Sequence, residues 1–319
     1  MILVQLLFDL LLKTPNETVV NKIIVRFLRA IQKMVLKFGM PLVNYDLAGT
    51  KVRIPLTHDL PFNLKSYPGY SSNVARIGQY AKEKFPDLTF IDIGANVGDT
   101  VILARKYCHY PILSIEGDEF YFSLLEKNLV NEKDVTLANA FIGDSNTPKK
   151  GSLRRYLGSV RLETGESATT TIDFKTLPEI LAEYPQFSRS KFLKIDTDGF
   201  DLKILRGAAE FLASAKPILF FEFDPNLLMA QNDDGISVFP FLQSLGYESS
   251  LLYDNCGVYL LSLSLSNLDL LMDLHYYFWV SQRYCDICVF HKEDAELFSS
   301  VRIRECSIVR EFCSKRGPI

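Results

Sequence analysis

The chain has 319 residues, of which 48% are hydrophobic, and a formal net charge of −3. This composition excludes a disordered chain and fits one large domain with extensions, or at most two domains. The small net charge gives no general attraction to nucleic acid, so no nucleic-acid partner is expected. The six cysteines follow no framework spacing and no cleavable leader is evident, which favours a cytoplasmic protein.

Residues 1–40 predict a helical N-terminal extension. The first 13 residues are apolar, but they contain Asp9 and are too few to cross a bilayer. Residues 17–39 predict a second helix, whose basic residues recur every three or four positions and so share a face: Lys22, Arg26, Arg29, Lys33 and Lys37. Two interpretations stay open: the helix packs on the domain with a solvated basic face, or it makes peripheral contact with an anionic membrane.

Residues 41–87 predict a segment that acts as a lid for the domain that follows. They include a strand candidate at 51–54, several prolines, and helical spacing of apolar residues at 71–84. A lid of this kind would bring Tyr67, Gly69 and Tyr70 within reach of a ligand in the domain.

Residues 88–295 predict an α/β domain, because strands and helices alternate from Phe90 and so indicate a parallel sheet with right-handed crossovers. Residues 145–168 interrupt this alternation and form either a mobile surface loop or a flap for substrate recognition. Further expectations are a strand at 168–172, a helix at 201–212, a hairpin at 247–263 and a last strand at 285–290. Residues 296–319 are expected to form a C-terminal tail.

Residues 90–99 predict a ligand site. An apolar strand carries the acid Asp92 and runs into a turn that contains Gly94, Asn96 and Gly98, ahead of a helix. Glycines at such a turn allow a ligand to approach the backbone closely. A dinucleotide site would require G-x-G-x-x-G, and the acid would repel a diphosphate. The pattern therefore favours a cationic cofactor, S-adenosylmethionine (SAM), with its ammonium toward Asp92.

The next two strand ends support a nucleoside ligand. Glu116 ends the second strand, about twenty residues after the glycine turn, where an acid accepts hydrogen bonds from ribose hydroxyls. Asn139 and Ala140 follow the third strand and are candidates for contact with the adenine edge. Three consecutive strand ends thus predict one cofactor site.

The sequence resembles the FkbM family of SAM-dependent methyltransferases. The resemblance implies a class I (Rossmann-like) fold, with a mostly parallel seven-stranded sheet and an antiparallel final strand, and methyl transfer to a hydroxyl oxygen. The chain departs from the family at Thr197-Asp198, where Val-Glu is commoner, and at Gly117, where Pro is commoner. The segments that carry the resemblance are I-D-I-G-A-N-V-G-D at 91–99, S-I-E-G-D at 114–118, F-L-K-I-D-T-D-G-F-D at 192–201, I-L-R-G-A at 204–208 and P-I-L-F-F-E-F at 217–223.

Four carboxylates follow the fourth and fifth strands and are expected at one edge of the site: Asp196, Asp198, Glu222 and Asp224. A carboxylate there can take the proton from an acceptor hydroxyl as the methyl group moves. Asp196 is the first candidate for this base and Asp198 the second. Alternatively, Asp196, Glu222 and Asp224 hold a Mg²⁺ ion that orients the acceptor, or Glu222 or Asp224 caps the turn that follows.

The sequence therefore predicts an O-methyltransferase that acts on a hydroxyl, with the family resemblance indicating a sugar in a glycan, glycolipid or secondary metabolite. The alternative is a SAM-binding scaffold without turnover that serves glycan assembly. The cluster of acids favours the enzyme, because a scaffold needs none of them.

Overall fold

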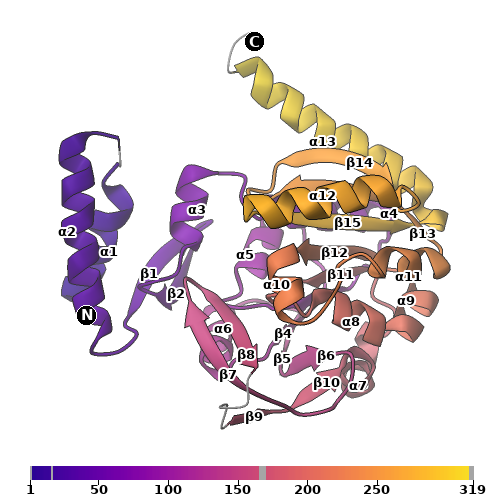
Figure 1. Cartoon of the computed structure of the whole chain (residues 1–319), viewed down its shortest axis with the longest axis horizontal. Coiled ribbons are helices and arrows are strands. Elements are labelled where there is room, and N and C mark those ends of the chain that lie inside the picture. Colours follow the sequence, from indigo (N-terminus) through magenta and orange to yellow (C-terminus); the bar gives the residue numbers. More distant parts are fainter. Residues whose placement is uncertain (1, 16, 165–169, 316–319) are drawn as a thin grey trace.

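A computed structural model describes residues 2–15, 17–164 and 170–315 of the chain. Figure 1 shows a central sheet with helices on both faces, and two helices, α1 (Ile2–Lys13) and α2 (Val19–Leu36), at one end of the molecule. The chain is therefore a layered α/β domain with a helical extension.

Within the described residues, eight strands form the main sheet, in the order β14, β13, β15, β12, β11, β3, β4, β5. β15 runs antiparallel to both of its neighbours, whereas β12, β11, β3, β4 and β5 pair in parallel. The mostly parallel sheet with a reversed last strand confirms the class I methyltransferase fold, and β14 extends the expected seven strands by one. The bounds are Phe90–Ile93 (β3), Ile112–Glu116 (β4), Val135–Asn139 (β5), Phe192–Ile195 (β11), Ile218–Phe223 (β12), Tyr247–Asp254 (β13), Tyr259–Ser264 (β14) and Cys285–His291 (β15).

The strand order reverses between β3 and β11. The chain leaves β3 for β4 and β5 on one side, and later returns on the other side as β11 and β12. Open α/β sheets bind ligands outside the carboxyl ends of the strands at such a reversal. Ile93 lies opposite Ile195 in the register, so both strands end at the same level and the residues after them meet.

Successive strand residues point to opposite faces of the sheet, and each face has its own core. Ile91 and Leu193 pack with residues of α8 and α11 on one face, whereas Phe90 and Phe192 stack on the other, which α4 and α5 cover. The helices of the domain are α3 (Leu60–Ser66), α4 (Ser72–Lys84), α5 (Asp99–Arg105), α6 (Glu119–Asn128), α7 (Leu177–Glu183), α8 (Asp201–Gly207), α9 (Ala209–Ala215), α10 (Pro225–Ala230), α11 (Val238–Ser244), α12 (Leu268–Ser281) and α13 (Ala295–Lys315).

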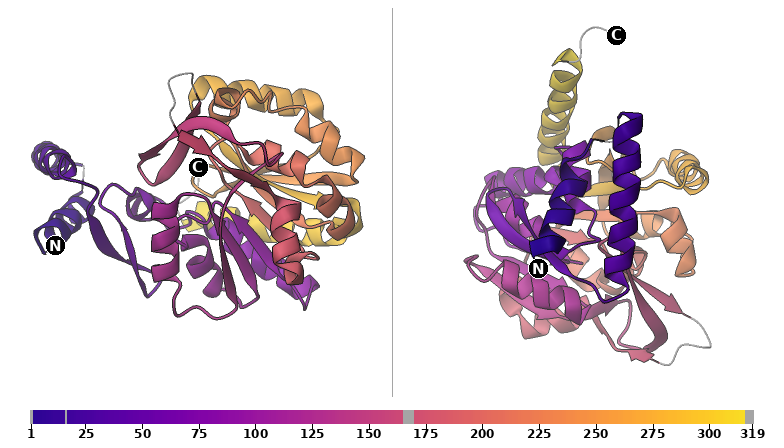
Figure 2. Two further views of the ribbon diagram at one scale, coloured as in Figure 1. Left: turned by 90° about the horizontal axis from the view of Figure 1, so that it is seen from below. Right: turned by 90° about the vertical axis from the view of Figure 1, so that its left-hand side faces the viewer.

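The N-terminal extension joins the domain through an antiparallel hairpin, β1 (Leu42–Leu47) and β2 (Thr50–Pro55). Figures 1 and 2 show α1 and α2 side by side beyond this hairpin, at the edge of the molecule. Gln5 of α1 holds Asn44 of β1 by two hydrogen bonds, from its Nε2 to the Asn44 carbonyl (3.0 Å) and from the Asn44 N–H to its Oε1 (2.8 Å). The extension is thus fixed to the hairpin by side-chain contacts.

The segment expected as a loop or flap at 145–168 contains a hairpin, β7 (Lys149–Tyr156) and β8 (Ser159–Thr164), with β9 (Thr170–Ile172) antiparallel to β7. Residues 165–168 of that segment, and 168–169 of the strand expected at 168–172, lie outside the described residues. β6 (Phe141–Gly143) and β10 (Phe174–Thr176) form a short parallel pair beside it.

Two expected elements differ in the structure. The helix expected at 201–212 is two helices, α8 and α9, which meet at Ala208. The C-terminal tail is a long helix, α13, through residue 315, and residues 316–319 lie outside the described part. Glu305 of α13 is buried and accepts two hydrogen bonds from Arg76 of α4, at 2.6 and 2.8 Å, which fixes this helix to the domain.

Candidate active site

Two adjoining cavities open at the carboxyl ends of β3, β11 and β12, with volumes of about 300 and about 80 Å³. Four residues line both cavities: Gly94, Asn96, Asp196 and Asp198. Gly94 and Asn96 belong to the turn after β3, and the two acids follow β11. The residues at the strand reversal therefore form the common wall of two compartments.

The smaller cavity has mostly apolar walls, and its acidic side chains are Glu116 and the two acids of the common wall. Its apolar walls include Ile115, Ala140, Phe141, Ile142, Leu162 and Phe174. Glu116 is 7% exposed, and burial raises the pKa of its carboxyl to about 7. An apolar slot with one buried carboxyl fits a nucleoside, because the base contacts the apolar walls and the carboxyl can accept from the ribose hydroxyls.

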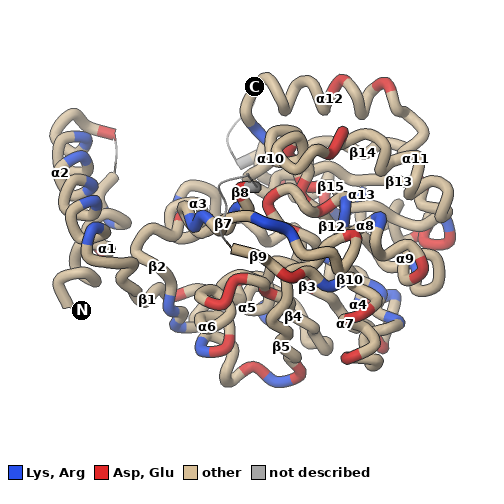
Figure 3. Tube along the Cα trace, turned by 60° about the horizontal axis from the view of Figure 1, so that its bottom comes forward, with Lys and Arg blue, Asp and Glu red and all other residues tan. Residues whose placement is uncertain are grey.

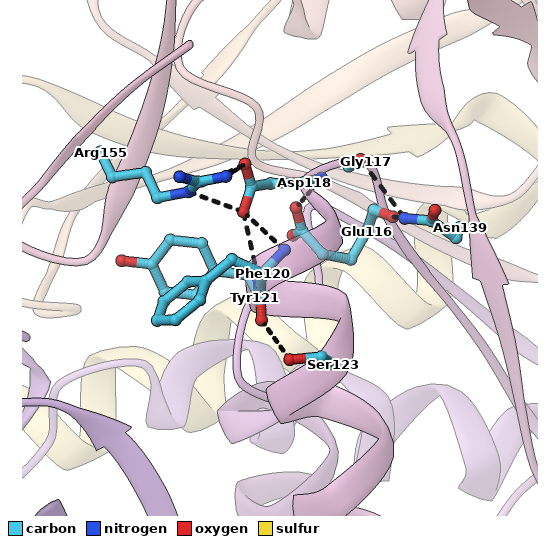
Figure 4. Close-up of polar contacts among 8 residues, drawn as sticks. All are labelled: Glu116, Gly117, Asp118, Phe120, Tyr121, Ser123, Asn139 and Arg155. Carbon is cyan, nitrogen blue, oxygen red and sulfur yellow. Dashed lines mark hydrogen bonds and ion pairs between the residues drawn. The ribbon is translucent and has the colours of Figure 1, made fainter. Parts of the chain in front are cut away.

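Glu116 is held in position by backbone donors. One carboxyl oxygen accepts from the Asn96 N–H at 2.9 Å and the other from the Asp118 N–H at 2.8 Å. Each oxygen keeps a second lone pair for a ligand hydroxyl. Figure 4 shows this carboxyl beside the turn that leads into α6.

The two residues expected after the third strand differ in position. Ala140 lines the smaller cavity, whereas Asn139 lines neither. The Asn139 amide nitrogen donates to the backbone carbonyls of Glu116 (2.8 Å) and Gly117 (3.3 Å), so it holds the turn itself (Figure 4). Among the described residues, Ala140 is thus the member of this pair that a ligand in the cavity could touch.

The two glycines of the first turn have different surroundings. Gly94 has φ +80°, and a Cβ there would run into the backbone carbonyl oxygen of Asp196. Gly98 has φ +88° and precedes α5, where a Cβ would come within 2.9 Å of Leu129 Cγ. Gly94 therefore lets the turn approach the end of β11, whereas Gly98, which lines neither cavity, allows close helix packing.

Asn96 connects three segments of the site. Its side-chain oxygen lies 3.2 Å from Nε2 of His58, and its side-chain nitrogen donates to the Gly158 carbonyl at 2.6 Å. The other His58 ring nitrogen accepts from the Leu60 N–H at 3.2 Å, which places the proton on Nε2, and burial lowers the pKa of this histidine. Asn96 thus ties the lid segment and the β7–β8 hairpin to the glycine turn.

Asp92 lines neither cavity, because Lys194 lies against it. Asp92 is fully buried, and its Oδ1 is 3.1 Å from Lys194 Nζ, which is also 3.4 Å from Asp196 Oδ2. Burial alone would lower the pKa of Lys194, but the carboxylates of Asp92 and Asp196 raise it above its usual value. Sequence reasoning did not single out Lys194, although a lysine inside the apolar strand F-L-K-I, next to Asp196, was the available signal.

Carboxyl groups outnumber cations in the larger cavity. Its lining includes Asp59, Asp99, Asp196, Asp198, Glu222, Asp224 and Asp286, against Lys194 and Arg161. Burial raises the pKa of Asp198 to about 7 and that of Asp286 to about 8, and the charge of Asp196 adds to both shifts. Burial also raises the pKa of Glu222 well above its usual value. The cavity therefore favours a positively charged ligand, and burial shifts the pKa of several of its carboxyls toward or above neutral pH.

The two candidate bases differ in exposure. The Asp196 side chain is 53% exposed and pairs with Lys194. The Asp198 side chain is 20% exposed, and its Oδ1 is 3.7 Å from Arg161 Nε of β8. Both lie in the common wall, so each is available to a group at the junction of the two cavities.

The possible Mg²⁺ site is not supported. Within the described ranges, no group of three or more His, Cys, Asp or Glu side chains is arranged to hold a metal ion. Asp224 caps α10 instead, because its Oδ1 accepts from the N–H groups of Asn226 (2.8 Å) and Leu227 (3.3 Å). The alternative in which Asp224 caps a turn is therefore correct, and Asp196, Glu222 and Asp224 are not assigned as ligands.

The β7–β8 hairpin covers the site. Leu153 and Leu162 line the smaller cavity, and Tyr156 and Arg161 line the larger one. Arg155 anchors the hairpin through hydrogen bonds of 2.7–3.0 Å to Asp118, whose side chain is fully buried (Figure 4). The hairpin of this segment therefore belongs to the walls of both cavities, and its role in substrate recognition stays a prediction.

The lid segment lines the larger cavity opposite the strand ends. Tyr70 belongs to its wall, whereas Tyr67 and Gly69 do not. Other polar side chains of this cavity come from the lid and from the loops that flank β14 and β15: Asn63, Asn73, Asn255 and Tyr284. These amide and hydroxyl groups suit a ligand rich in hydrogen-bonding groups.

Comparison with known proteins identifies relatives of the domain. Residues 92–249 match the model of the methyltransferase FkbM domain. Methyltransferase 1 of Beauveria bassiana is 29% identical over 156 residues, an alignment that covers 40% of this chain and 61% of the relative. The chain thus spans less than two thirds of that relative's length.

Solved structures resemble the chain more distantly. A methyltransferase FkbM from Methylobacillus flagellatus has 13% identity and a TM-score of 0.40, covering 83% of this chain and 59% of that one. A precorrin-6y C5,15-methyltransferase from Geobacter metallireducens has 16% identity and a TM-score of 0.35, covering 65% of this chain and 80% of that one. Such low TM-scores support no transfer of substrate or mechanism.

Proposed function

Because residues 92–249 match the methyltransferase FkbM domain, we propose that the chain transfers a methyl group from SAM to a hydroxyl oxygen of a sugar-like acceptor. One observation carries the proposal: the apolar slot at Glu116 and the larger polar cavity share Gly94, Asn96, Asp196 and Asp198. A cofactor in the first and an acceptor in the second would meet at two carboxyl groups.

The smaller cavity has the groups that SAM requires. Glu116 would accept from the ribose hydroxyls, and Ala140, Phe141 and Ile142 would contact the base. Since Lys194 neutralises Asp92, the carboxyls that remain for the cofactor's ammonium are those facing the larger cavity, such as Asp99 beside the glycine turn. SAM supplies an electrophilic methyl group on a positively charged sulfur.

The larger cavity suits a polyhydroxylated acceptor. Its amide side chains can each donate and accept, and its carboxyls of raised pKa can do either, depending on their proton. A sugar presents several hydroxyls that pair with such groups, whereas an extended apolar acceptor would leave them without partners. This match supports the sugar class that the family resemblance implies.

Asp196 and Asp198 supply the base in this proposal. An alkyl hydroxyl is a weak nucleophile near neutral pH, and a carboxylate at the junction can take its proton as the oxygen receives the methyl group. Lys194 holds Asp196 in place by the ion pair at 3.4 Å. Asp198, with a pKa of about 7, is matched to proton transfer at neutral pH.

The test combines binding and turnover. Glu116→Ala should weaken SAM binding by about 1–3 kcal/mol in calorimetry, because ribose hydroxyls lose their acceptors. Asp196→Asn should keep SAM binding but slow transfer of labelled methyl to a panel of sugars by about 10²–10⁴-fold. Asp87→Asn, which removes an exposed carboxylate outside the site, is the matched control and should be unaffected.

Three results would contradict parts of the proposal. Unchanged SAM affinity in Glu116→Ala would remove the cofactor assignment, and normal turnover in Asp196→Asn would remove that base. SAM binding that depends on Glu116, without methyl transfer to any acceptor of the panel, would favour the non-catalytic scaffold.

A further inference from the structure

Helix α2 carries large apolar side chains that are exposed because no other part of the described chain packs on them. Ile23 and Phe27 are 60% and 65% exposed, although they lie in the middle of an 18-residue helix. The exposed apolar residues recur at three- and four-residue spacing and so share one side: Val20, Ile23, Ile24, Phe27 and Met34. The buried residues of the helix, Leu28 and Gln32, lie on a different side.

A basic stripe runs beside this apolar side. At 100° per residue, Lys22, Arg26 and Lys33 fall within about 40° of one another, next to the apolar residues, and Lys37 continues the stripe past the helix end. All four side chains are exposed, and α2 contains no acidic residue. Figure 3 shows this concentration of basic residues along α2, in a chain whose net charge is −3.

The helix is also remote from the candidate active site. None of the residues that line the two cavities comes from α1 or α2. Figures 1 and 2 show both helices at the edge of the molecule, beyond the β1–β2 hairpin. The apolar and basic sides of α2 therefore face outward without serving the site.

Charge decides between the surfaces that could cover this helix. A second copy in a two-fold dimer would bring two identical basic stripes together, and like charges repel. A bilayer with anionic lipids offers an apolar layer beneath a negatively charged surface, which matches both sides of α2. None of the helices within the described ranges could span a bilayer.

We propose that α2 lies on the surface of a bilayer that contains anionic lipids. Phe27 and Ile23 enter the boundary of the acyl chains, and Lys22, Arg26 and Lys33 contact the charged headgroups. The binding keeps the catalytic domain next to the membrane. This inference depends on α2 alone and does not require the proposed methyl transfer.

The experiment uses the full chain and sedimentation with vesicles of phosphatidylcholine containing about 30% phosphatidylserine. The wild type should bind these vesicles and not pure phosphatidylcholine, and its binding should weaken as salt rises. The charge variant carries Lys22→Gln, Arg26→Gln, Lys33→Gln and Lys37→Gln. Its partition coefficient should fall by about 10²–10³-fold, because each basic residue near the surface adds roughly a factor of five.

Two further variants make the result specific. The control removes the same charge from exposed sites on the domain: Lys106→Gln, Lys127→Gln, Lys133→Gln and Arg189→Gln. It should bind as the wild type does. The apolar variant, Ile23→Ser with Phe27→Ser, should also lose binding, and circular dichroism should show it folded, because both side chains are exposed.

The proposal is overturned if the wild type stays in the supernatant with anionic vesicles, or if the charge variant and its control bind equally. A dimer in light scattering that Phe27→Ser dissociates, without any vesicle binding, would assign the surface to a second copy of the chain instead.

Discussion

Replacing Lys194 by methionine should lower the free energy of unfolding markedly. The substitution keeps an unbranched side chain that is one atom shorter and removes its charge. Asp92 is 0% exposed and lies 3.1 Å from the Lys194 ammonium, so the variant leaves a carboxyl without a cation in the interior. Asp196, which shares the same ammonium, is half exposed and can turn to water.

The expected loss follows from the burial of the remaining acid. Breaking a buried ion pair by removing one partner costs about 3–5 kcal/mol, because the uncompensated charge has lost its water. An exposed pair is worth about 0–1 kcal/mol. Arg154 and Glu163, 3.1 Å apart with side chains 68% and 54% exposed, provide such a pair as a control.

The sign of the pH dependence can also be stated. Burial raises the pKa of Asp92, and Lys194 opposes this shift, so in Lys194→Met the folded-state pKa of Asp92 rises further above its unfolded value. A raised carboxyl pKa favours the folded state at low pH, and that contribution is lost as pH rises through the folded-state pKa. The destabilisation by Lys194→Met should therefore be smaller at pH 5 than at pH 8 (about 1.4 kcal/mol per pH unit at most).

Urea unfolding followed by circular dichroism measures these differences. Lys194→Met should lose about 3–5 kcal/mol at pH 8, and Arg154→Met less than about 1 kcal/mol. Adding Asp92→Asn to Lys194→Met should recover part of the loss, because a neutral amide replaces the unpaired acid. The reasoning is refuted if Lys194→Met costs less than about 1 kcal/mol, or if the second substitution recovers nothing.

Two further predictions concern the site. Gly94→Ala should lower both SAM affinity and the free energy of unfolding, because a Cβ there meets the Asp196 carbonyl. The control is Gly49→Ala, at φ +86° with nothing within 4 Å of the added Cβ, which introduces backbone strain without a clash. If the two variants show equal losses in calorimetry and urea unfolding, the clash at Gly94 is contradicted. kcat/KM should rise with pH through about 7, because Asp198 accepts a proton only when it is ionised. This rise should be lost in Asp198→Asn. An unchanged pH profile in that variant would assign the rise to another group.

The sequence predicted the parts of the site that depend on local order. Gly94 and Glu116 could be placed at the site because, in a parallel sheet, a glycine turn after one strand and an acid at the end of the next strand both lie at the ligand-binding edge. The ion pair of Asp92 with Lys194 could not be predicted, because it depends on which strand lies beside β3. The position of the β7–β8 hairpin likewise depends on Arg155 meeting Asp118, a contact between distant segments that no local pattern encodes.

Which side of α2 faces outward could not be predicted from the local sequence pattern either. Spacing identified a helix with a basic side, but it could not say which of the remaining sides the domain would cover. The structure buries Leu28 and Gln32 and leaves Ile23 and Phe27 exposed. Tertiary packing alone decides such a division, because the whole helix is rich in apolar residues.

The ion pair at the centre of the sheet also fixes how the two central strands align. Asp92 and Lys194 are direct neighbours in the β3–β11 register, and both point to the face that α4 and α5 cover. Shifting β11 by one residue would turn Lys194 to the other face and set Leu193 or Ile195 opposite Asp92. Both charges would then lie unpaired in apolar surroundings. In strands of four residues each, where apolar side chains are nearly interchangeable, this one polar contact distinguishes the native alignment from its neighbours.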